Sequence, residues 1–107
     1  MEHAQHVLVI TTTETEEAAH RLATSCVDAR LGACSQIVGP ISSVYRWKGS
    51  LETAQEWRVE TKTTAERIES LRSHIVTHHD YDLPEVVVVP IIGGSNEYLS
   101  WVDDEVG

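Results

Sequence analysis

The first third of the chain changes from a strand-like to a helix-like spacing of apolar residues. An unbroken apolar and β-branched run over 7–13 predicts a central strand buried on both faces. Apolar residues then recur at helical spacing, which predicts a helix over 14–31. Thr13 and Glu16 have the spacing of a capping box at its start, and Gly32 stands where a helix commonly ends.

The middle of the chain alternates between apolar and polar residues, as strands do. Strands are predicted over 33–47 and 51–62, joined by a turn at 48–50. Gly39-Pro40 interrupts the first of them, which indicates a bulge or a bend because proline cannot join a central ladder. Each arm of this hairpin can run to about ten residues or more, whereas the mean strand has roughly 5–6.

The last part of the chain returns twice to helical spacing. A helix is predicted over 64–78, opened by a second capping box of Thr63 and Glu66. Four consecutive valines within 85–92 predict another buried strand, and a short helix follows over 96–105. The order β-α-β-β-α-β-α predicts an α+β, ferredoxin-like sandwich with a long central hairpin.

The length of the hairpin has a consequence for assembly. Two helices cannot cover a hairpin this long, so its apolar side chains, Val44, Trp47, Trp57 and Val59, would be exposed in a monomer. We expect another subunit to cover them, and Tyr45, Trp47 and Trp57 to act as interface aromatics. Two alternatives remain: the hairpin curls over its own sheet, or these rings line a ligand pocket.

Composition narrows the class of protein. A chain of 107 residues is one domain, 1–107, in which we expect 1–6 to be flexible. Its net charge of −9 argues against nucleic-acid binding and favours cations as partners. Without a membrane-length apolar run or a signal-like N-terminus, we expect a cytoplasmic protein with no membrane insertion. Cys26 and Cys34 form no C-x-x-C pair and are expected to be reduced.

Motifs for catalysis are absent from the sequence. It contains no phosphate-binding glycine loop, no nucleophile elbow and no H-E-x-x-H motif, so we expect no enzyme activity. Gly93-Gly94-Ser95 precedes a predicted helix, whose N-terminus could bind an anion, but ordinary turn chemistry explains these residues without a function. His3 and His6 lie near the terminus and would bind metal only adventitiously.

A group of histidines is the sharper chemical signal. His74 and His78 lie four residues apart on a predicted helix, so their side chains share one face and can hold zinc, copper or nickel. His79, Asp80 and Asp82 follow directly. The alternative is structural, because imidazoles in the last turn of a helix interact favourably with its dipole.

Motifs along nearly the whole chain resemble the CutA family, the divalent-cation tolerance proteins. They occur in this order: Leu31-Gly32-Ala33-Cys34, Tyr45-Arg46-Trp47-Lys48-Gly49, Glu52, Glu56, Lys62-Thr63, His78-His79-Asp80-Tyr81, Leu83-Pro84-Glu85 and Tyr98-Leu99-Ser100-Trp101. The resemblance implies a ferredoxin-like protomer, a homotrimer with strands pairing between neighbours, and weak association with copper or other divalent cations.

The resemblance also implies a set of metal ligands, two cysteines and a histidine. One cysteine matches Cys34 and the histidine matches His78 or His79. The other cysteine position holds Ile10, and Asp80 replaces the usual proline beside the histidines. A site of histidine with carboxylate, suited to zinc or copper(II), is therefore expected in place of a thiolate copper site, with His74 as a further candidate.

A second implication comes from the similarity of this family's trimers to PII-type signalling proteins. It places a small effector in an inter-subunit cleft near Lys62, Tyr81 and Trp101. A third hypothesis is a trimeric scaffold that acts through an unknown protein partner.

Overall fold

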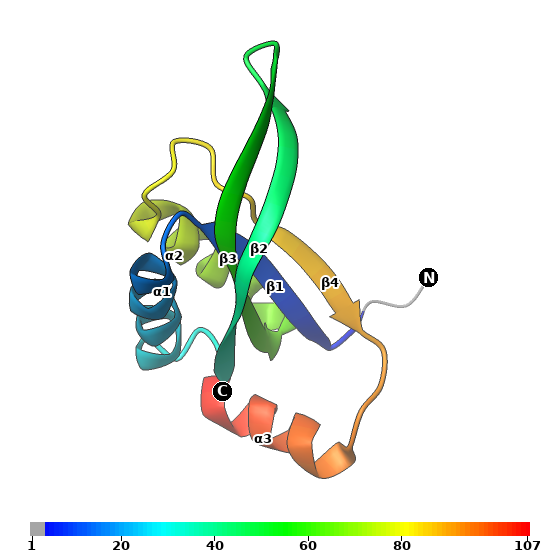
Figure 1. Cartoon of the computed structure of the whole chain (residues 1–107). Helices are drawn as coiled ribbons and strands as arrows, with labels where there is room; N and C mark the ends of the chain where they lie inside the picture. Colours follow the sequence, from blue (N-terminus) through cyan, green and yellow to red (C-terminus); the bar gives the residue numbers. More distant parts are fainter. Residues whose placement is uncertain (1–3) are drawn as a thin grey trace.

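The computed structural model describes residues 4–107 and contains one four-stranded antiparallel sheet with three helices (Figure 1). The strand order is β2-β3-β1-β4. The elements in chain order are β1 (His6–Thr13), α1 (Glu16–Asp28), β2 (Cys34–Trp47), β3 (Ser50–Thr64), a 3₁₀ turn (Ala65–Arg67), α2 (Ile68–His78), β4 (Val87–Ile91) and α3 (Asn96–Val106). This order confirms the predicted α+β, ferredoxin-like fold.

The three helices cover different parts of the sheet. α1 and α2 lie on one face, while α3 lies across the end opposite to the projecting hairpin (Figure 1). Val102 and Val106 of α3 pack there against Ala33. None of the helices within residues 4–107 is long and apolar enough to cross a bilayer.

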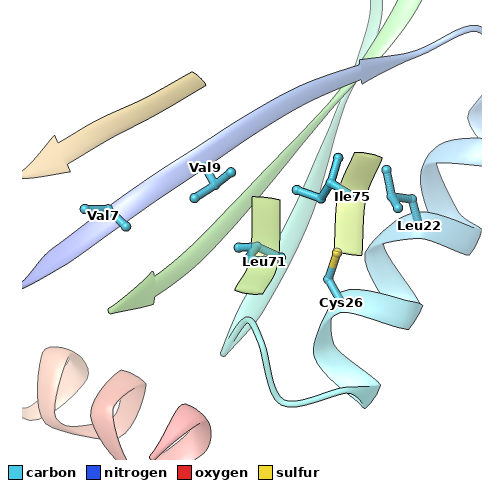
Figure 2. Close-up of a cluster of buried hydrophobic side chains, with 6 residues drawn as sticks. All are labelled: Val7, Val9, Leu22, Cys26, Leu71 and Ile75. Carbon is cyan, nitrogen blue, oxygen red and sulfur yellow. The ribbon is translucent and has the colours of Figure 1, made fainter. Parts of the chain in front are cut away.

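The main core forms where α1 and α2 press on β1. Val7 and Val9 point toward the helices, and α1 and α2 contribute two side chains each (Figure 2). The cluster consists of Val7, Val9, Leu22, Cys26, Leu71 and Ile75. The intervening residues of β1, Leu8 and Ile10, are only half-buried. The predicted burial therefore holds fully on the face that α1 and α2 cover, whereas on the other face of the single chain only Thr12 is buried.

Both ends of α1 differ from the prediction. The N-cap is Thr15, whose Oγ1 accepts a hydrogen bond from the Ala18 amide at 3.0 Å. Thr13 instead donates its hydroxyl to the Thr15 carbonyl at 2.8 Å. At the other end Arg30, with a φ of 59°, takes the left-handed conformation expected of Gly32. The helix therefore begins and ends inside the predicted range 14–31.

The second predicted capping box is also wrong. β3 continues to Thr64, and α2 begins at Ile68 after the 3₁₀ turn. Thr63 is fully buried and donates its hydroxyl to the Leu31 carbonyl at 2.7 Å, so it cannot cap a helix. Strand pairing with β1 extends β3 over residues whose local pattern resembles a helix start.

The N-terminal segment is ordered further than expected. His6, predicted to be flexible, begins β1 and pairs with Thr64 and Ile91. Its Nε2 also lies 2.8 Å from a carboxylate oxygen of Asp103 in α3. Residues 1–3, including His3, lie outside the described part of the chain.

The β2–β3 hairpin is long, as the alternation predicts. Its arms span 14 and 15 residues and project well beyond the helices (Figure 1). The pairing shifts register between Val38 and Ile41, at the predicted interruption. Gly39 is required there because a Cβ at this position would lie 2.5 Å from the Trp57 ring. The hairpin therefore bends where an indole packs on bare backbone.

Two of the four residues expected on an exposed hairpin face are covered by the protomer itself. Val59 is buried against Ala19 and Ala23 of α1, and Trp57 packs against the same cluster. Val44 and Trp47, farther along the arms, remain exposed. The prediction therefore holds only for the outer part of the hairpin.

β4 is an edge strand with exposed side chains. Val87, Val88 and Val89 are each more than 40% exposed, so the prediction of a buried strand is wrong for the single chain. β4 pairs with β1 on one side only, and this leaves its other edge open. An exposed apolar edge of this kind is a surface that proteins usually cover.

Cys26, which is fully buried, is expected to resist thiol reagents while the protein is folded. Burial raises the pKa of its thiol from 9.0 to about 11, so little reactive thiolate exists near neutral pH. In a Cys34→Ser variant, DTNB at about pH 8 should label Cys26 only after urea unfolds the chain. Because the thiol ionises first in the unfolded chain, stability should also fall as the pH rises above 9.0. Rapid labelling of the folded variant would contradict this burial.

Candidate functional site

The imidazole of His79 is fully engaged by hydrogen bonds within the protein. Its Nε2 lies 2.9 Å from the Thr12 carbonyl oxygen and 3.1 Å from Oγ1 of Thr11. The Tyr81 amide donates to its Nδ1 at 3.0 Å. Since a carbonyl only accepts and an amide only donates, Nε2 carries the proton and the Nδ1 lone pair is occupied. His79 therefore anchors the loop after α2 to β1 and has no lone pair free for a metal.

His78 and His74 each retain one free ring nitrogen. His78 donates from Nδ1 to the His74 carbonyl at 2.8 Å, which leaves its Nε2 lone pair available. Ser25 donates its hydroxyl to the Leu22 carbonyl, so its oxygen accepts from Nε2 of His74 at 2.9 Å. The Nδ1 lone pair of His74 is then available.

The rings of His74 and His78 also lie against each other. Their ring centroids lie 4.1 Å apart. Burial, and secondarily the neighbouring His78, lowers the pKa of His74. Both effects favour the neutral ring, which is the form that binds metals.

A small cavity of about 110 Å³ lies between the start of α1 and the end of α2. Its lining includes His78, His79 and two carboxylates, those of Glu14 and Asp80. Asp80 also accepts a hydrogen bond from Arg21 at 3.3 Å, in an exposed ion pair. The structure therefore brings together three of the predicted metal-site residues: His78, His79 and Asp80.

Cys34 lies in a different part of the chain. It pairs with Lys62 across β2 and β3, and Lys62 pairs in turn with Leu8. His79 contacts Thr12, four residues farther along β1, so about 13 Å of strand separates the two regions. The thiol and the histidines do not converge within one chain.

Cys34 instead lies beside Tyr98 of α3. The pKa of Tyr98 is raised by burial first and by the neighbouring Cys34 second. Residues 4–107 contain no group of three histidines, cysteines or carboxylates placed to hold one metal ion. With isoleucine at position 10, the described residues do not fit the cysteine-rich copper site that the family resemblance implies.

The three residues proposed for an effector cleft also divide into two groups. Lys62 donates to Gln36 at 2.7 Å and lies over the Tyr98 ring, 6.0 Å from its centroid. Trp101 contacts the same ring, with centroids 5.4 Å apart. Tyr81 instead contacts Glu56, which precedes Lys62 by six residues of β3, about 20 Å of strand. Within one chain these side chains do not form a common site.

A larger groove lies between the hairpin and the loop that follows α2, and we call it the hairpin groove. Its volume is about 750 Å³. The lining residues are Thr12, Glu14, Ser43, Val44, Tyr45, Trp47, Ala54, Gln55, Glu56, Tyr81, Asp82, Leu83 and Glu85. Tyr45 and Trp47, two of the predicted interface aromatics, belong to this lining.

Glu56 is the functional candidate that the sequence pattern did not reveal. It is only 8% exposed, and its Oε2 accepts a hydrogen bond from the Tyr81 hydroxyl at 2.7 Å. Burial and the Glu56 carboxylate raise the pKa of Tyr81, so the phenol stays a donor. In the sequence Glu56 alternates with Trp57, and this predicts an exposed position; only its match to a family motif singled it out.

Comparisons with known proteins agree with this architecture. The family model for "CutA1 divalent ion tolerance protein" matches residues 7–105. The chain is 37% identical over 100 residues to the divalent-cation tolerance protein CutA of Thermus thermophilus, covering 94% of this chain and 97% of that protein. It is 41% identical over 96 residues to a chloroplastic CutA of Arabidopsis thaliana, covering 90% of this chain but spanning about half, 53%, of that relative.

A solved structure gives the same result for the fold. CutA from Xylella fastidiosa superimposes with a TM-score of 0.94 at 31% identity, over 97% of this chain and 100% of that one.

Proposed function

Since the chain belongs to the CutA1 family of divalent ion tolerance proteins, we propose that it binds divalent metal cations weakly and contributes to metal tolerance. The proposal is supported by the name of the family and by one feature of the site. His78 keeps a free Nε2 and lines a cavity together with the carboxylates of Glu14 and Asp80. Imidazole with carboxylate suits zinc or copper(II) better than copper(I).

The donor set supports weak binding. His79 is engaged by β1, and Asp80 also faces Arg21, so His78 is the main protein ligand that needs no rearrangement. The remaining ligands would be water or carboxylates that must move. A site built from so few fixed donors contributes little pre-organisation to the affinity.

Titration of Cu²⁺ and Zn²⁺ into the wild type and into single histidine variants tests this proposal. His78→Ala should weaken binding about tenfold or more, the lower limit for losing a group that supports a metal. His79→Ala should leave the affinity nearly unchanged but lower the free energy of unfolding by about 1–3 kcal/mol, because it leaves buried partners on β1 unpaired.

His20→Ala, on the exposed face of α1, serves as the control and should change neither quantity. If His78→Ala binds both metals as the wild type does, the proposed ligand is wrong. If the affinity falls only in His79→Ala, the metal ligand is His79, to which we assign a structural role.

We further propose that the protein is a cytoplasmic homotrimer that performs no catalysis and binds no nucleic acid. Exposed apolar side chains on β4 and on the outer hairpin support the assembly, because a neighbouring chain would cover them. Tyr45 and Trp47 remain the interface candidates, whereas Trp57 packs mainly within its own protomer. A net charge of −9 per chain supports cations over nucleic acid.

A further inference from the structure

We propose that α3 is a latch that opens while the rest of the chain stays folded, and that its opening uncovers the Cys34 thiol. This goes beyond divalent-metal tolerance, because it concerns a moving element that lies apart from the metal candidates. Four features of α3 support the proposal: a small core of its own, a glycine linker before it, an unfavourable order of charges within it, and attachment by basic side chains of other segments.

α3 packs on the sheet through a small cluster of its own. Val102 and Val106 are the fully buried residues of this helix, and they form a cluster with Ala33. That cluster shares no residue with the two clusters that α1, α2 and the sheet form. Since buried apolar area sets the free energy of packing, two valines hold α3 less strongly than the main core holds α1 and α2. Detachment of α3 would therefore leave the main core intact.

The segment before α3 can accommodate its movement. Gly93 and Gly94 lie between the end of β4 at Ile91 and the start of α3 at Asn96. A Cβ at Gly93 would meet no atom within 4 Å, so neighbouring residues do not pack on the linker there. Glycine also has the widest backbone freedom of all residues. The linker is therefore suited to act as a hinge.

The order of charges within α3 opposes helix formation. Its last turn contains Asp103, Asp104 and Glu105 and no basic residue. Because the C-terminal end of a helix is the negative end of its dipole, carboxylates there are unfavourable. A helix of 11 residues is also too short to be stable alone in water. α3 therefore depends on contacts with the rest of the chain, and it would unfold when it detaches.

Basic side chains from three other segments supply those contacts. Arg30 and Arg67 donate to the carbonyls of the last two residues of α3, at 3.1 Å and 2.7 Å. His6 of β1 donates from Nε2 to the Asp103 carboxylate at 2.8 Å. These donors compensate the negative end of the helix. A segment that is held by few apolar contacts and by polar contacts near the surface is typical of local opening.

Cys34 lies under this latch. It follows Ala33, on which the two valines of α3 pack, and it lies beside Tyr98 of the same helix. Figure 1 shows the C-terminal end of α3 beside the start of β2. Detachment of α3 would remove both neighbours and expose the half-buried Cys34, whereas Cys26 would stay in the main core. The position of α3 would then set the access of electrophiles or oxidants to this thiol.

Two measurements on the intact wild type test the latch directly. They are amide hydrogen exchange and labelling by N-ethylmaleimide, read by mass spectrometry, which distinguishes the two cysteines. After correction for intrinsic rates, the amides of α3 should exchange about tenfold faster or more than those of α1 and α2. Cys34 should be labelled while Cys26 is not. Exchange of α3 at the rate of α1 and α2 would overturn the proposal, because α3 would then open only with the whole chain.

Arg67→Met removes one attachment of α3 and keeps the apolar stem of the side chain. The labelling rate of Cys34 should rise about tenfold or more, because a hydrogen bond from a charged donor is lost. Exchange in α1 should not change. Arg72→Met is the matched control: Arg72 lies on α2 and, among residues 4–107, pairs with Glu69, so this variant should be labelled as the wild type is.

Val102→Ala tests the same latch through its packing, in case Arg67→Met does not fold. It should also speed the labelling of Cys34, whereas Val76→Ala, at a valine of α2 that is 43% exposed, should not. Equal labelling of Cys34 in the wild type and in the folded α3 variants would mean that reagents reach the thiol without movement of α3, and would overturn the proposal. A parallel rise at Cys26 would indicate global unfolding and overturn it as well.

Discussion

Leu71→Ala is expected to lower the free energy of unfolding by about 2–5 kcal/mol. Leu71 has no exposed surface and lies between α1 and β1 in the main core (Figure 2). Its loss removes apolar burial and leaves a cavity that two helices and a sheet cannot close by local movement. Urea unfolding at a fixed protein concentration measures the change.

Leu83→Ala is the matched control, because it makes the same chemical change at a side chain that is 72% exposed. It should alter stability by no more than about 0.5 kcal/mol, as surface substitutions usually do. A loss at Leu71 that is no larger than the loss at Leu83 would mean that the packing of α2 on β1 is wrong.

Val87→Asp is expected to convert the assembled protein to monomers at micromolar concentration. Val87 is 45% exposed on the open edge strand β4, on the surface that we propose a neighbouring chain covers. An aspartate placed there would lose its hydration without gaining a partner, at a cost of several kcal/mol for each interface. Sedimentation equilibrium of the wild type and the variant measures the mass directly.

Val27→Asp makes the same substitution at a valine on α1 that is 40% exposed. It should assemble as the wild type does, so a monomer in both variants would indicate general destabilisation instead of a lost interface. A wild-type protein that is itself a stable monomer at micromolar concentration would contradict the trimer.

The predictions that differ from the structure share one cause. The four valines predict a buried strand because the local pattern records apolarity but not the place of the strand in the sheet. β4 lies at an edge, and whether it is covered depends on a second chain. Likewise Thr13 and Thr63 have cap-like spacing, but their hydroxyl groups donate to the carbonyls of Thr15 and Leu31.

Two adjacent histidines of the site show the same limit of prediction from a local sequence pattern. His78 and His79 are neighbours of the same type, and helix periodicity cannot say which of them is free to bind a metal. Their hydrogen-bond partners distinguish them. His79 donates to the Thr12 carbonyl of β1, whereas His78, among residues 4–107, donates to the His74 carbonyl in the preceding turn of its own helix. The partners of His79 on β1 are separated from it by more than sixty residues in the sequence.

The sequence by itself determined the order of strands and helices, the long hairpin, the acidic charge and the family, because each of these follows from local spacing, composition or motifs. The tertiary structure alone decided which histidine keeps a free nitrogen, that Cys34 lies apart from the histidines, and that Glu56 is buried beside Tyr81. These properties depend on contacts between residues distant in the chain, and packing brings such residues together without leaving a periodic signal in either segment.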